Sequence, residues 1–189
     1  MVSYETTLRH FLSSGDVERA GLFAASCAER MAQLFTGVVG TDPARAADVE
    51  LVVDCLDRLW STAATHPWEE LADRLLRLPE LAGEEVPDGL YSYAYEAAGA
   101  LHYACKYRET HDTTHIESCC NHALNAAEFI SDEIGDGVDR YEVECTRQLA
   151  DISDLSSAPR AFDDSLRQAL RDRSREHSKA LLAELIQAT

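Results

Sequence analysis

Three of the seven histidines and two of the six cysteines have spacings that could place them around one metal ion. His115, Cys119 and His122 stand at positions i, i+4 and i+7, so on a helix their side chains fall within roughly 60° of one another. His102 and Cys105, at i and i+3 of the preceding segment, could face them from an antiparallel helix. Imidazole and thiolate are ligands that Zn²⁺ takes at tetrahedral positions. The spacing therefore predicts a zinc or small-ligand site at these five residues.

The same residues also have a purely structural interpretation. Ala126 and Phe129 continue the stripe of Cys119, which would make this cysteine a small core residue and the histidines boundary residues. Cysteine is among the most frequently buried residue types, and the chain contains no Cys-x-x-Cys. Both interpretations are open at this stage.

Three charged residues, Glu29, Arg30 and Glu96, stand within helices that are otherwise apolar or rich in Ala and Tyr. Burial would require hydrogen-bonding partners, which an ion pair between Glu29 and Arg30 or the tyrosine hydroxyls beside Glu96 would supply. The chain has no Glu-x-x-His pairs for a di-iron bundle, no nucleophile elbow and no phosphate loop. We therefore predict no catalytic residue, and do not expect an enzyme.

Helices must position these residues, because apolar side chains recur at three- and four-residue steps and Gly and Pro are few. The predicted helices are Tyr4–Leu12, Val17–Val38, Pro43–Ala64, one from Trp68 to near Pro79, Leu90–Glu109, Thr114–Ile130, Val138–Leu155 and Arg160–Ile186. The sequence thus predicts an all-α fold: residues 1–189 form a single domain, a multi-helix bundle of seven or eight helices. The Ala- and Tyr-rich helix pair between Leu90 and Ile130 is expected at its centre, because small side chains suit a crowded position.

The last helix, residues 160–186, has an unusual middle section, RDRSREHSK, with almost no apolar face. We expect this section to project from the body. Its basic residues, Arg171, Arg173, Arg175 and Lys179, could instead pack against the acidic body or against a second subunit, which would give a homodimer.

The formal net charge is −17, and it is unevenly distributed along the chain. Residues 1–158 contain 29 acidic and 11 basic residues, whereas residues 159–189 contain 5 and 6. Such a surface repels phosphate backbones, so we do not expect nucleic-acid binding. We expect a basic protein partner instead.

No segment reaches the ~18 continuous apolar residues of a membrane span, and the first residues lack a signal-peptide pattern. We expect a cytoplasmic protein with reduced cysteines.

Short motifs along the chain resemble those of a known family. They are Ala28-Glu29-Arg30-Met31, the Leu-x-x-x-Trp segment from Leu56 to Trp60, and Leu90-Tyr91 at the start of the Ala-rich helix. With helices of matching length and order, the chain resembles the YjaG-like family of bacterial proteins, domain of unknown function 416. The resemblance implies an all-helical fold and supplies no activity, cofactor or catalytic residue.

Two functional hypotheses follow. The first is a non-enzymatic protein-binding module, similar in size and charge to immunity or inhibitor proteins that neutralise bacterial toxins. The alternative is a metal- or small-ligand-binding protein that uses the Cys/His cluster between the two central helices.

Overall fold

α-Helices dominate the fold. A computed structural model describes residues 3–62, 66–159 and 164–188, and within these residues it contains nine α-helices, one 3₁₀-helix and no β-strand. The α-helices are α1 (Tyr4–Leu12), α2 (Val17–Val39), α3 (Ala46–Leu59), α4 (Trp68–Leu75), α5 (Pro79–Ala82), α6 (Leu90–Thr110), α7 (Thr114–Ile134), α8 (Arg140–Ser157) and α9 (Asp164–Ala188), with the 3₁₀-helix η1 at Pro43–Arg45. The predicted all-α multi-helix bundle is confirmed. None of the described helices is both long and apolar enough to span a membrane.

The described residues contain one helix more than the sequence predicted, because α5 forms a separate single turn. Pro79 takes its first position, where the missing amide hydrogen has no consequence. Glu80 in this turn is buried and accepts hydrogen bonds of 3.0 and 2.8 Å from the Arg45 guanidinium. The predicted helix boundaries at Ala64 and Arg160 lie outside the described residues.

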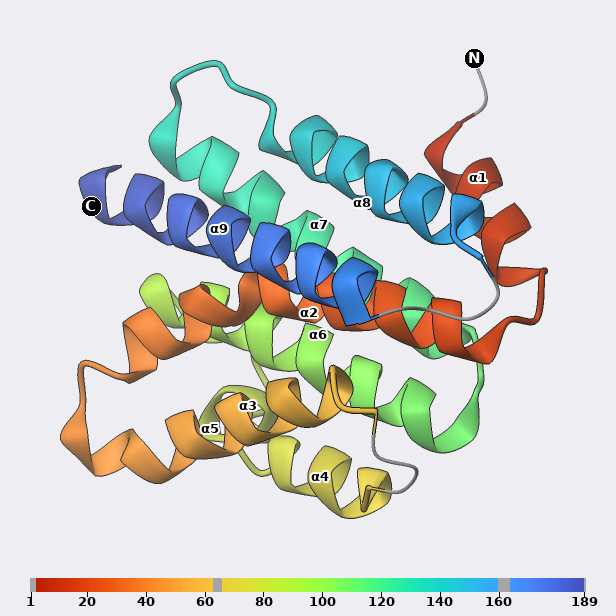
Figure 1. The fold of residues 1–189 in the computed structure, drawn as a ribbon. Helices are drawn as coiled ribbons and strands as arrows, with labels where there is room; N and C mark the ends of the chain where they lie inside the picture. The colour runs from red at the N-terminus through yellow and green to blue at the C-terminus, as the bar shows by residue number, and fades with distance from the viewer. Residues whose placement is uncertain (1–2, 63–65, 160–163, 189) are drawn as a thin grey trace.

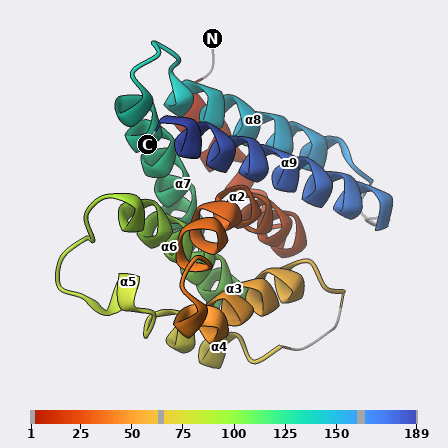
Figure 2. The ribbon, with the colours of Figure 1, turned by 90° about the vertical axis from the view of Figure 1, so that its left-hand side faces the viewer.

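α2 is the most enclosed helix of the bundle. Every residue from 20 to 32 is buried, so the helix has neighbours on all sides. The Ala- and Tyr-rich helices α6 and α7 pack against each other, and both also pack against α2. Figures 1 and 2 show α8 and α9 on one side of α2, and α3 and α4 on the other. The core is thus organised around α2 and α6, with α7 as their common neighbour.

α9 lies along α2 over much of its length (Figure 1), and the prediction that residues 171–179 project from the body is wrong. Ser174 and Ser178 are both 1% exposed, and the Ser178 hydroxyl accepts a hydrogen bond of 2.9 Å from the backbone N–H of Gln33 on α2. Gly37 of α2 permits the close approach, since a Cβ there would lie 2.4 Å from Leu182. The segment lacks an apolar stripe because small serines and ion pairs make its contacts.

The basic residues of α9 pack against acidic residues of the body. This was one of the two arrangements that the sequence predicted for them. Arg173 bonds to Asp151 and Asp154 of α8 at 2.6 and 2.8 Å. Arg171 and Arg175 contact Glu29 of α2 and Asp57 of α3. These side chains therefore neutralise carboxylates within the chain, while a second-subunit role for α9 remains a prediction.

Candidate functional site

The five predicted metal ligands do not form one cluster. The rings of His102, His115 and His122 gather around Tyr103, with centroid distances of 5.0, 6.0 and 5.5 Å. Cys105 and Cys119 are fully buried among the helices of the core. No group of three His, Cys, Asp or Glu side chains in the described residues is arranged to hold a metal ion. The five residues therefore do not come together as their spacing predicted, because α6 and α7 direct the cysteines into the core.

The buried thiols have protein partners. Cys119 donates to the carbonyl oxygen of Ala24 on α2 at 3.6 Å, and a hydrogen bond to Cys27 together with burial raises the pKa of the Cys119 thiol. A hydrogen bond to Cys55, again with burial, raises the pKa of Cys105. All six cysteines are free and buried. Cys105 and Cys119 consequently remain protonated near neutral pH, which makes them poor nucleophiles and metal ligands.

His102 and His122 lie instead in a pocket of about 190 Å³ between α6, α7 and the loop after α5. The Nδ1 atom of His122 lies 2.6 Å from the Oε2 atom of Glu96, which is only 3% exposed. The Nδ1 atom of His102 lies 3.1 Å from the carbonyl oxygen of Ala72. Since no other hydrogen bond to either ring occurs within the described residues, Nε2 remains available to a ligand on both rings.

The same pocket depends on one glycine. Gly99 of α6 faces the His122 ring, and a Cβ built there would lie 2.5 Å from it. Tyr95 and Tyr103 of α6 line the pocket together with Leu81 and Val86. The His122 imidazole, which Glu96 holds in place, therefore faces a partly apolar cavity. The pKa of His102 is lowered by burial, which favours the neutral ring. The arrangement could bind a small molecule that donates a hydrogen bond.

The other predicted buried residues have structural partners. Glu29 accepts hydrogen bonds from the Trp60 indole at 2.8 Å and from Arg175 at 2.9 Å. Arg30 donates to Glu144 at 2.9 Å and also to Asp151. The expected Glu29–Arg30 pair does not form, because adjacent residues on a helix point about 100° apart. These residues connect α2 to α3, α8 and α9.

Glu96 is buried as expected, but its partner differs. Its carboxylate contacts the imidazole of His122 on α7, 26 positions further along the chain, and not the tyrosine hydroxyls of its own helix. The adjacent Tyr95 points about 100° away from Glu96 around α6, whereas α7 brings His122 directly against the carboxylate.

An acidic groove at the α7–α8 end of the bundle is the surface feature that residue-type motifs did not identify. It has a volume of about 330 Å³ and is lined by Glu128, Ser131, Asp132, Asp139 and Tyr141. Neither Glu128 nor Asp132 forms an ion pair within the described part of the chain, and both are exposed. The pKa of Tyr141 is raised by burial and by nearby acidic groups that include Glu128. The groove thus concentrates uncompensated negative charge.

Exposed apolar side chains accompany this groove. Phe129, Val138 and Val143 are 39%, 47% and 38% exposed, and each lies in the segments that form the groove. The signal in the sequence was local charge density: residues 128–142 contain six acids and one base, Arg140. Arg140 is itself occupied, because it bonds to Asp136 and Glu184.

The chain matches no protein-family model, no curated protein and no solved structure.

Proposed function

We propose that this chain is a non-enzymatic helical module that binds a basic protein through the acidic groove between α7 and α8, in the manner of an immunity or inhibitor protein. The observation that carries the proposal is a groove with three carboxylates, none of which forms an ion pair in the described residues, flanked by exposed apolar side chains.

Internal pairing of basic residues supports this assignment. Arg30, Arg171, Arg173 and Arg175 form ion pairs with carboxylates of the same chain, and Arg140 next to the groove does the same. Their positive charge therefore does little to screen the exposed carboxylates around the groove. A surface of this kind accelerates encounter with a basic partner and discriminates against acidic ones.

The groove also has the composition of a binding centre. A lysine or arginine side chain of a partner could enter between Glu128, Asp132 and Asp139, where its charge would be compensated. Phe129, Val138 and Val143 would lose water on contact, and apolar burial next to a charged anchor is typical of interface hot spots. Arginine on the partner is the stronger candidate, because its planar guanidinium can bond two carboxylates at once.

The double variant Glu128→Gln/Asp132→Asn tests the proposal. We expect it to weaken binding of the partner by about tenfold, because two charges that face the partner are lost while the shape is retained. The measurement is a pull-down from host lysate at low and at moderate salt, followed by titration of the captured protein.

The matched control is Glu50→Gln/Asp73→Asn, which removes two exposed carboxylates from α3 and α4; Figure 1 shows these helices on the other side of α2 from α8. Both double variants carry the same net charge, so a general effect of charge would weaken binding equally in the two. Equal weakening, or stoichiometric metal in the purified protein without a protein partner, would contradict the proposal.

A second candidate function rests on the His122–Glu96 pair. The pocket that contains it offers one ring nitrogen of His122 and partly apolar walls to a small ligand with a hydroxyl group. The carboxylate orients the imidazole, so that Nε2 can accept a hydrogen bond.

Phenol is a suitable probe for this pocket, because it combines an acidic O–H donor with a ring of suitable size. In an NMR titration we expect shifts at residues of α6 and α7, and about tenfold weaker binding in His122→Ala. His10→Ala, at an exposed position of α1, should bind like the unaltered chain. Identical affinity in the three chains would exclude the pocket as the binding site.

A further inference from the structure

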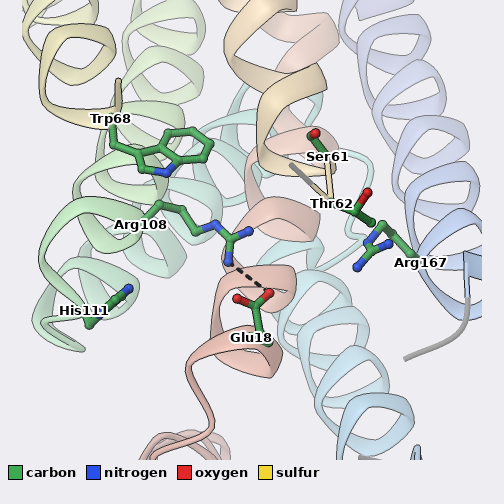
Figure 3. Close-up of a pocket in the computed structure, with 7 residues that line it drawn as sticks. All are labelled: Glu18, Ser61, Thr62, Trp68, Arg108, His111 and Arg167. Atoms are coloured by element: carbon green, nitrogen blue, oxygen red, sulfur yellow. Dashed lines mark hydrogen bonds and ion pairs between the residues drawn. The ribbon is translucent and has the colours of Figure 1, made fainter. Parts of the chain in front are cut away.

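A second pocket has the opposite electrostatic character to the rest of the molecule. Its volume is about 260 Å³, close to the lower end of the range for small-molecule sites, about 300–1,000 Å³. Figure 3 shows Arg108 of α6 and Arg167 of α9 on opposite sides of it, with Thr62 beside Arg167 and His111 at the far edge. In a chain of net charge −17, two guanidinium groups facing one cavity, against the single carboxylate of Glu18 in its lining, form a local positive site.

Arg108 is held in place by its surroundings. Its guanidinium carbon lies 5.8 Å from the centroid of the Trp68 ring, in cation–π geometry. Its nitrogen lies 3.5 Å from a carboxylate oxygen of Glu18, whose side chain is 64% exposed. An ion pair this long and this exposed contributes little, so an incoming anion could compete with Glu18.

Arg167 is only partly satisfied. Its side chain is 17% exposed, and its one ion pair within the described residues is with Asp164 at 3.0 Å, a carboxylate that is 94% exposed. The Nε atom of Arg167 is buried and has no hydrogen-bond partner in the part of the chain that the structure describes. A buried donor without an acceptor is unfavourable, and an oxygen-rich ligand would supply the missing acceptor.

The pocket continues into a neighbouring depression. A second cavity of about 300 Å³ shares Ser61, Thr62 and Arg167 with it and is also lined by Arg171. The shared residues supply a hydroxyl group and a guanidinium at the junction. An anionic group bound between Arg108 and Arg167 would therefore leave room for the remainder of a small molecule.

We infer that this pocket binds a small phosphate monoester, with its phosphate between Arg108 and Arg167. Guanidinium groups bond phosphate oxygens through paired N–H donors, and the Thr62 hydroxyl and His111 ring can supply further hydrogen bonds. Two arginines match the double negative charge of a phosphate monoester better than the single charge of a carboxylate. The site is separate from the acidic groove at the α7–α8 end, so it is independent of the proposed protein partner.

Calorimetric titration of the full chain with phenyl phosphate, at constant ionic strength, tests the inference. We expect saturable 1:1 binding, weakened about tenfold or more in Arg167→Gln, because each charge-assisted hydrogen bond contributes about 1.5–3 kcal/mol. Glu18→Gln should strengthen binding severalfold, since it removes the carboxylate that competes for Arg108. Inorganic phosphate in a parallel titration separates recognition of the free ion from recognition of an ester, and tighter binding of the free ion would overturn the assignment to a monoester.

Two control variants make the result interpretable. Arg74→Gln removes one charge from an exposed arginine of α4 that does not line the pocket, and it should bind like the unaltered chain. Thr62→Ala, at an exposed position, should weaken binding with no change in thermal unfolding. Absence of saturable binding, equal losses in Arg74→Gln and Arg167→Gln, or weaker binding in Glu18→Gln would each overturn the inference.

Discussion

Replacing Arg30 with methionine should lower the free energy of unfolding by about 3–5 kcal/mol, because it removes the closest counter-charge of buried Glu144 and leaves buried Asp151 with Arg173 alone. Arg30 is 1% exposed and bonds to both Glu144 and Asp151, which are themselves 1% exposed. Urea unfolding followed by circular dichroism measures the change. Methionine preserves much of the packing of the arginine stem, so the loss reports mainly on charge.

Neutralising the partners should restore much of this stability. In the triple variant Arg30→Met/Glu144→Gln/Asp151→Asn neither buried carboxylate is left charged, Arg173 keeps its pair with Asp154, and Arg147 loses only a 4.0 Å contact with Glu144. Apolar or neutral replacements of buried ion networks are often tolerated. Arg58→Met, which breaks an exposed pair with Asp54, should cost less than about 1 kcal/mol. A loss in Arg30→Met no larger than that of Arg58→Met would show that the network contributes little.

Acidification from pH 7 to about 4 should destabilise the fold through His177 of α9. Burial, with the nearby positive charges of Arg147, Arg30 and Arg173, lowers the pKa of His177 to about 4, and only Asp151 acts in the opposite direction. Between this value and the ordinary histidine pKa of about 6.5, the unfolded chain binds a proton that the folded chain excludes. Stability from this residue is therefore complete above pH 6.5 and lost as the pH falls towards 4. A fully buried group would contribute about 3 kcal/mol, which partial exposure reduces to about 2 kcal/mol.

Comparison of His177→Asn with the unaltered chain isolates this contribution, because other groups also titrate over the same range. Burial lowers the pKa of His66 and His102, which adds to the loss, whereas the raised pKa of buried Glu144 opposes it. Unfolding midpoints in urea at pH 7 and pH 4.5 should show a shallower pH dependence in His177→Asn. The exposed histidine variant His10→Asn should keep the steeper dependence, and parallel pH profiles in all three chains would rule out the role of His177.

The sequence was informative about helices because their signals are local. Apolar spacing located each long helix, and the helix start predicted at Pro43 is present as a 3₁₀ turn that Asp42 caps. Burial of Glu29, Arg30 and Glu96 was also predictable, because these residues stand within helices that are otherwise apolar or rich in Ala and Tyr. The resemblance to the YjaG-like family remains a prediction.

The partners of these residues were not predictable, because they depend on how distant helices pack. Glu29 meets arginines 142 and 146 positions later in the chain, and no local pattern encodes that distance. The Cys/His stripe illustrates the same difficulty. Helical spacing placed His115, Cys119 and His122 close in angle around α7, but it did not reveal which of these side chains faces the core, and Cys119 does. The arginine pocket combines residues from α2, α4, α6 and α9 with residues that follow α3 and α6, and none of them stands out within its own segment.

The position of α9 also determines when the earlier helices can reach their final packing during synthesis. Asp151 can pair with Arg30 of α2 as soon as α8 is made, but Glu29 emerges early and waits for arginines of α9, which is synthesised after every other described helix. Until then, the Glu29 carboxylate must remain hydrated, so α2 cannot reach its final packing. The nascent bundle would therefore stay loosely closed and accessible to chaperones and proteases until α9 docks, although its eight earlier helices are already made.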